Sequence, residues 1–253
     1  MLIQMLATIV ALTNEFGSVA VDTEGALVLS YVPKGGEEVF FRQSGAKAPG
    51  GWYNGGVPVC WPWFNLQGDP GTVAHGFARL KEWTLVTRED GAKASKAVFR
   101  LEEAGAYRLD YEVILDASLT LRLSMCNTGK ERFVVTTGLH PYFAVSSPDN
   151  VTVTTPEGKV LQGRAGMDGG LPFGEGVYDV RDRGNGRRMS LKMFGNTTLI
   201  LWNCGPDEPM KGMAGDDWNR YLCIEPAVIP RAKGFYLHPG ETRSIGLAVS
   251  ASR

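Results

Sequence analysis

Two ionisable residues stand in apolar surroundings, and each comes directly before a proline. Glu225 closes the run YLCIEP, and His140 lies within TTGLHPYF. A fully buried glutamate is rare without a partner, so Glu225 either pairs with a cation or lines a cleft, where loss of water raises the pKa of its carboxyl group toward that of a general base. A histidine and a glutamate can move protons without a cofactor or metal. We interpret His140 and Glu225 as a candidate acid–base pair, with a purely structural histidine as the alternative for His140.

A second candidate site lies in the hexapeptide AHGFAR. In an extended segment His75, Phe77 and Arg79 occupy alternate positions and point to the same face. An imidazole, an aromatic ring and a cation on one face could form the wall of a polar-ligand site. The alternative is a histidine at a strand end that makes a single backbone hydrogen bond.

An acidic pair lies next to a tryptophan in the segment GMAGDDWNR. Asp216 and Asp217 precede Trp218, and this combination resembles the edge of a sugar site, with carboxylates for hydroxyl groups and an indole for the pyranose face. A solvated acidic loop explains the pair equally well.

These side chains need a scaffold, and the sequence predicts one made of strands. Apolar residues alternate in AYRLDYEVILD and SLTLRLSMCN, which is typical of half-buried antiparallel strands. The 32 glycines and 14 prolines are spread along the chain, as expected for many strands joined by turns. We find no sustained helical period, internal repeat or compositional break. The sequence therefore predicts an all-β fold of large packed antiparallel sheets, in one domain over residues 1–253.

Charge and composition exclude several classes of function. The 26 basic and 27 acidic residues give a net charge of -1, and nucleic-acid grooves or membrane-surface patches need clustered basic residues. The segment MLIQMLATIVALTNEFG lacks the basic start of a signal peptide and is too short to span a bilayer. We expect no nucleic-acid partner, no membrane and a cytoplasmic location.

The cysteines do not form a recognisable metal motif. Cys60, Cys126, Cys204 and Cys223 lie far apart, with no CxxC pair and no histidine at ligand spacing, so we predict no metal site. Free thiols in a reducing compartment are the expected state.

Several segments taken in order resemble the aldose 1-epimerase superfamily, and within it the hexose-6-phosphate mutarotase (glucose-6-phosphate 1-epimerase) branch. They are GGVPVCWPWF at 55–64, HGFAR at 75–79 with EW at 82–83, LHPYF at 139–143, WN at 202–203, KGMA at 211–214 and CIEPA at 223–227. The resemblance covers nearly the whole chain. It implies a β-supersandwich with a sugar cleft on a concave face and a cofactor-free reaction.

The resemblance also implies roles for individual residues. Glu225 would take the proton of the anomeric hydroxyl, and His140 would protonate the ring oxygen, so that the ring opens and closes again as the other anomer. His75 would hydrogen-bond the sugar. Asp216 or Asp217 would accept a hydrogen bond from a ring hydroxyl, with Asp216 favoured.

One position departs from the pattern of the phosphate-sugar branch. An arginine usually precedes GG-x-P-x-CWPWF and grips phosphate together with the arginine of HGFAR, but this chain has Asn54 there and retains Arg79. A dianion held by one arginine lacks a second charge-assisted partner, although Lys47 could reach in.

Three functional hypotheses follow. The first is a mutarotase acting on a small-molecule aldohexose or its 6-phosphate. The second is an aldose 1-epimerase for unphosphorylated sugar, and the third is a non-catalytic carbohydrate-binding protein on the same fold. The oligomeric state is left open, with a monomer as one alternative.

Overall fold

The computed structural model describes residues 8–45, 53–65, 72–208, 210–229 and 235–252. These residues form β-strands, with three single turns of 3-10 helix and no α-helix: η1 (Ala78–Leu80), η2 (Pro148–Asn150) and η3 (Asp217–Arg220). No helix in these ranges has the length and apolar character needed to cross a membrane. The prediction of an all-β fold is therefore confirmed.

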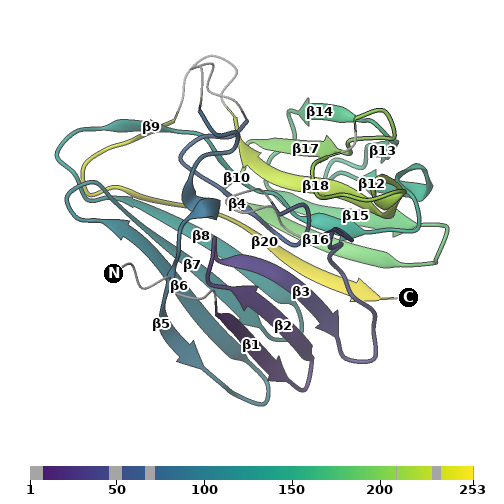
Figure 1. Ribbon diagram of the computed structural model, residues 1–253, viewed down its shortest axis with the longest axis horizontal. Coiled ribbons are helices and arrows are strands. Elements are labelled where there is room, and N and C mark those ends of the chain that lie inside the picture. Colours follow the sequence, from purple (N-terminus) through teal and green to yellow (C-terminus); the bar gives the residue numbers. More distant parts are fainter. Residues whose placement is uncertain (1–7, 46–52, 66–71, 209, 230–234, 253) are drawn as a thin grey trace.

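The largest sheet has nine antiparallel strands, and it runs across Figure 1 from β5 at the lower left to β12 and β13 at the right. Its strands, in spatial order, are β13 (Val160–Gln162), β12 (Val151–Thr154), β15 (Gly176–Asp182), β16 (Arg188–Phe194), β20 (Thr242–Ser252), β8 (Leu119–Asn127), β7 (Tyr107–Leu115), β6 (Ser95–Glu103) and β5 (Thr84–Glu89).

A second sheet packs on the first, with β10 and β18 against β20. Its strands are β14 (Asp168–Leu171), β17 (Thr198–Trp202), β18 (Tyr221–Val228), β10 (Thr137–Leu139) and β4 (Val59–Cys60), and β11 (Tyr142–Ala144) also pairs with β18. Two small sheets complete the fold: β1 (Ile9–Asn14), β2 (Gly17–Asp22) and β3 (Leu27–Pro33) form one, and β9 (Phe133–Val135) and β19 (Phe235–Leu237) form the other.

The alternation read from the sequence matches the burial of the central strands. Leu109, Tyr111 and Val113 of β7 are fully buried, while the residues between them are partly exposed. Each aliphatic side chain buried in this way contributes about 1.5–3 kcal/mol. One apolar cluster extends from β1 to β20. The single-domain assignment for residues 1–253 stays a prediction.

Strand β18 is the exception to half-burial, because all eight of its residues are buried. Its alternation persists in what each face contacts: Leu222 and Ile224 join the main core, whereas Tyr221 and Cys223 join a smaller aromatic cluster on the other side. Glu225 has the same parity as Cys223 and therefore lies on the second face.

Backbone contacts hold the segment around Trp61 to the segment that carries His75. The Trp61 carbonyl accepts hydrogen bonds from the Phe77 and Ala78 amides, at 3.0 and 3.2 Å. Gly76 reaches this carbonyl with a φ of 72°, and a Cβ atom added there would stand 2.0 Å from the Trp61 oxygen. Only glycine fits this turn.

We expect Gly76→Ala to lower the free energy of unfolding by about 3–5 kcal/mol, because the methyl group would collide with backbone as well as strain φ. Gly105→Ala is the matched control, since Gly105 has a φ of 74° but no atom within 4 Å of the added Cβ. It isolates the conformational cost of about 1 kcal/mol. Urea unfolding monitored by circular dichroism gives both values, and equal losses would contradict the proposed contact.

Candidate active site

A cavity of about 430 Å³ opens beside the second sheet, within the size range of small-molecule sites. Its lining comes from several strands and connecting segments and combines polar with aromatic side chains. The lining residues are Phe64, Asn65, Ala74, His75, Arg79, His140, Tyr142, Asp168, Gly170, Ile200, Trp202, Met210, Glu225 and Ile229.

Strand register explains why distant residues meet at this cavity. Asp168 lies opposite Trp202, Trp202 lies opposite Cys223, and Cys223 lies opposite Tyr142. Directly opposed residues of antiparallel strands share a face, so these four residues form one row across the sheet. Glu225 and its partner Ile200 lie two positions further along.

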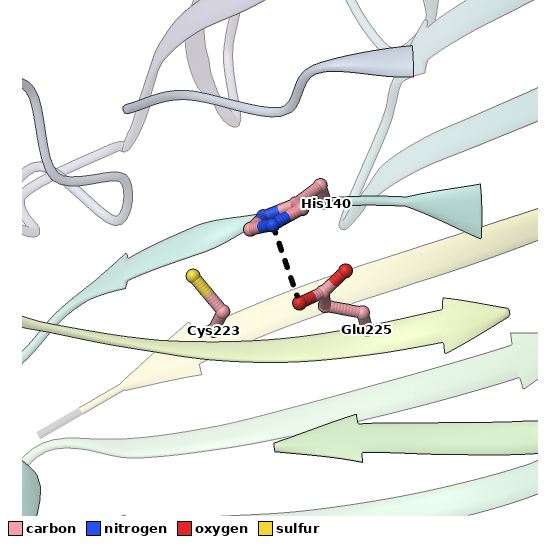
Figure 2. A group of neighbouring side chains, drawn as sticks. All are labelled: His140, Cys223 and Glu225. Atoms are coloured by element: carbon pink, nitrogen blue, oxygen red, sulfur yellow. Dashed lines mark ion pairs between the residues drawn. The ribbon is translucent and has the colours of Figure 1, made fainter. Parts of the chain in front are cut away.

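His140 and Glu225 meet at the cavity, as the sequence predicted. His140 Nε2 lies 3.5 Å from Glu225 Oε1, and the two residues are 5% and 1% exposed. Figure 2 shows the Glu225 carboxylate rising from β18 toward the imidazole ring. The His140 ring stacks on the Tyr142 ring, with the ring centres 4.9 Å apart. This stacking helps to fix the orientation of the imidazole. His140 is also anchored by its backbone amide, which donates to the Pro58 carbonyl.

The Glu225 carboxylate is buried without hydrogen-bond donors. Within the described part of the chain, neither of its oxygens has a hydrogen-bond partner. Burial, reinforced by the negative charge of Asp168, holds the pKa of Glu225 well above its usual value. Burial also lowers the pKa of His140, and His75 and Arg79 add to that effect. Both directions favour the uncharged forms of Glu225 and His140.

His75 and Arg79 also line the cavity. The His75 ring stands edge-on to the His140 ring at 5.3 Å, and its Nδ1 accepts a hydrogen bond from the Asn65 amide. Burial, together with the charge of Arg79, lowers the pKa of His75 to about 4. Arg79 donates to the Ala74 carbonyl at 2.8 Å, and burial lowers its pKa to about 10. At neutral pH the cavity therefore has a neutral imidazole beside a cation.

Phe77 does not join His75 and Arg79 at the cavity. A single turn of 3-10 helix follows it instead of an extended strand, so the assumed alternation fails. The Phe77 ring packs edge-on against Trp61, with the ring centres 5.5 Å apart, and lines a different hollow.

Asp216, the aspartate favoured for sugar binding, does not line the cavity either. Asp216 is exposed and is absent from the cavity lining. Asp217 is buried, and its carboxylate accepts hydrogen bonds from Ser44 and from the Ala214 amide, so its role is to hold the loop.

A second carboxylate beside Glu225 lines the cavity and belongs to Asp168, which sequence reasoning missed. Asp168 begins β14 and faces Trp202 across the pair of strands. A lone aspartate in AGMDGGL gives little signal among 27 acidic residues. The available clue was the glycine pair after it, which leaves room beside the side chain.

Asn54 is buried and hydrogen-bonded within the protein. It is 1% exposed, and its side-chain amide donates to Gln43 Oε1 at 3.0 Å and to the Lys211 carbonyl at 2.8 Å. These bonds fix the segment that carries Met210 to the cavity rim. Asn54 itself does not line the cavity. Lys47, the other candidate cation, lies outside the described residues.

The fold also assembles a possible metal-ligand group that spacing in the sequence did not suggest. Ligand atoms of His140, Cys223 and Glu225 all lie within 4.8 Å of one another, and all three residues are buried. The four cysteines are free thiols, as expected.

Comparisons with known proteins agree with this architecture. The family model for aldose 1-epimerase matches residues 8–176, and the chain belongs to the aldose 1-epimerase family. Over 227 residues it is 28% identical to a protein of Salmonella typhimurium (strain LT2) named "Putative glucose-6-phosphate 1-epimerase", with 80% of this chain and 76% of the relative covered.

Two solved structures show the same fold. One is "a putative mutarotase (YeaD)" from Salmonella typhimurium, with a TM-score of 0.88, 20% identity and coverage of 98% and 91% of the two chains. The other is a galactose mutarotase related enzyme from Lactobacillus acidophilus, with a TM-score of 0.73, 15% identity and coverage of 97% and 98%. The predicted supersandwich is confirmed.

We expect Asn54→Asp to destabilise the protein by about 1–3 kcal/mol, because a carboxylate cannot donate to the Lys211 carbonyl and would face Gln43 Oε1. Asn185→Asp is the matched control, since only the accepting oxygen of Asn185 is used, by the Arg187 amide. The control should change stability by less than about 0.5 kcal/mol. Thermal and denaturant unfolding check both, and equal effects would rule out the donor role of Asn54.

Proposed function

We propose that this protein interconverts the α and β anomers of an aldohexose, carried as its 6-phosphate. The observation that carries the proposal is the buried pair of His140 and Glu225, 3.5 Å apart on the wall of a cavity. No described residue donates a hydrogen bond to the Glu225 carboxyl group, so its oxygens can interact with a substrate hydroxyl.

The pair holds one proton, and its position sets the chemistry. A protonated Glu225 beside a neutral imidazole has the same number of protons as a carboxylate beside an imidazolium. Burial favours the neutral arrangement. Sugar hydroxyls that donate to Glu225 favour its ionised form. Substrate binding therefore moves the pair toward the productive charge state.

The reaction then needs one acid and one base. Glu225 accepts the proton of the anomeric hydroxyl while His140 donates its proton to the ring oxygen, and the bond between that oxygen and the anomeric carbon breaks. The anomeric carbon becomes an aldehyde and rotates. Ring closure with the two roles reversed gives the other anomer. Because both groups are already placed, positioning replaces the random encounter of the uncatalysed reaction.

The other lining residues fit substrate binding. Asp168 can accept hydrogen bonds from ring hydroxyls, and neutral His75 can hydrogen-bond the sugar. Trp202 lines the cavity with an aromatic ring, and this ring stands edge-on to the His140 ring with the ring centres 5.8 Å apart. Arg79 is placed to bind an anionic group of the substrate.

Phosphate recognition rests on Arg79 and on the name of the Salmonella typhimurium relative. Arg79 is the cationic side chain among the described lining residues, whereas Asn54 takes the place of an arginine and lies elsewhere. Because only one guanidinium among the described lining residues can bind phosphate, an epimerase for unphosphorylated aldoses is the second candidate.

We expect Glu225→Gln to lower turnover by about 10²–10⁴-fold while sugar affinity is largely kept, because glutamine keeps the shape but cannot take the proton. Anomer exchange followed by NMR or polarimetry measures the rate, and calorimetry measures binding. Asp216→Asn is the matched control, because this carboxylate is exposed and outside the cavity. Unchanged exchange in Glu225→Gln would refute the acid–base assignment and favour a binding protein.

We expect Arg79→Gln to raise the KM for glucose 6-phosphate by about tenfold or more and to change the KM for glucose little, because the lost interaction is with phosphate. Lys81→Gln is the control, since Lys81 is an exposed cation two residues away. Wild-type activity on glucose equal to that on glucose 6-phosphate, or an equal effect of Arg79→Gln on both, would count against the phosphosugar.

A further inference from the structure

Cys223 lies next to the acid–base pair but has no part in the proposed reaction. It precedes Glu225 by two residues on β18, so both side chains rise from the same face toward His140 (Figure 2). Cys223 is fully buried and is not among the cavity-lining residues. A thiol, an imidazole and a carboxylate thus converge with their ligand atoms within 4.8 Å.

This donor set matches the chemistry of zinc. Zn²⁺ binds sulfur, nitrogen and oxygen ligands at about 2.0–2.3 Å, and tetrahedral geometry places the ligand atoms roughly 3.3–3.8 Å apart. The His140–Glu225 distance of 3.5 Å already lies in this range. Small side-chain rotations would bring Cys223 into it. With three protein ligands, the fourth position would face the cavity, which His140 and Glu225 line.

The electrostatics of the site also favour a cation. Both Glu225 oxygens are buried without hydrogen-bond partners among the described residues, and Asp168 adds a second carboxylate to the same cavity. A divalent ion would favour the ionised form of Glu225, compensate its charge together with that of Asp168, and act as a partner for the Glu225 oxygens. The positive charge of Arg79 opposes the binding of a cation in this cavity. His140, Cys223 and Glu225 therefore have to hold the ion by direct coordination.

We propose that His140, Cys223 and Glu225 form an inhibitory Zn²⁺ site in the wall of the cavity. Binding forms bonds to the imidazole nitrogen, the thiolate sulfur and a carboxylate oxygen. The thiol proton, and the proton shared by the acid–base pair, leave to solvent. The ion occupies the imidazole lone pair and the carboxylate at once, so metal and sugar exclude each other.

The inhibition rests on the proposed function, whereas the binding does not. Two readouts separate them. Cobalt(II) bound to a thiolate gives a charge-transfer absorption band in the near ultraviolet. This band reports the Cys223–metal bond whether or not the protein catalyses anomer exchange. Anomer exchange at buffered free Zn²⁺ concentrations reports inhibition.

The experiment compares the wild-type protein with Cys223→Ser and with a control, Cys126→Ser, which changes a cysteine on β8 of the nine-stranded sheet instead of one on β18. We expect the wild type and Cys126→Ser to show the cobalt band and inhibition by Zn²⁺. Cys223→Ser should lose the band and require at least about tenfold more Zn²⁺ for the same inhibition, with its exchange rate in chelator unchanged. Added sugar should weaken the band of the wild type.

Three results would overturn the proposal: no thiolate band in the wild type, a band that Cys223→Ser retains, or Zn²⁺ inhibition equal in the wild type and Cys223→Ser. If Cys223→Ser does not fold, Cys223→Ala is used instead, because alanine removes the thiol without burying a hydroxyl group. A cobalt band that Cys223→Ser abolishes, in a protein without anomer exchange, would support the metal site and contradict the proposed function.

Discussion

The rest of the site depends on a carboxyl group held in a place where it cannot be solvated. Glu225 lies on a strand that is buried at all eight positions, and its described neighbours give its oxygens no hydrogen-bond donor. Burying an ionised carboxylate without donors is costly, so the group raises its pKa instead. The His140 ring at 3.5 Å gives the proton an alternative position. Under the proposed mechanism, a ligand that donates hydrogen bonds to Glu225 shifts the proton toward His140.

The surrounding structure fixes the geometry of that pair from both sides. Register across β14, β17, β18 and β11 places Asp168, Trp202 and Tyr142 in one row with Cys223. On the opposite wall, the bonds from Phe77 and Ala78 to the Trp61 carbonyl set the approach of the segment that carries His75 and Arg79. Gly76 permits this approach because no side chain intervenes. Backbone contacts therefore position the segment that carries His75 and Arg79.

Period-two patterns and local context carried most of what the sequence could predict. Alternation in β7 and β8 gave the sheets, because each strand faces the core on one side only. Glu225 and His140 were identifiable because an ionisable residue in an apolar run needs an explanation. Phe77 was misplaced because the turn at Ala78–Leu80 breaks the alternation. Asp168 and Asn54 required tertiary information: the first depends on strand register, and the second on a contact with Lys211, far along the chain.

The substitution at position 54 has a different meaning once its contacts are known. Read as a missing arginine, Asn54 suggested a weakened phosphate clamp. In the structure its amide joins Gln43 to the Lys211 carbonyl and so holds the rim of the cavity. A buried arginine at this position would carry a charge that needs a partner. In the structure, position 54 therefore bears on the cavity through the loop that its amide holds.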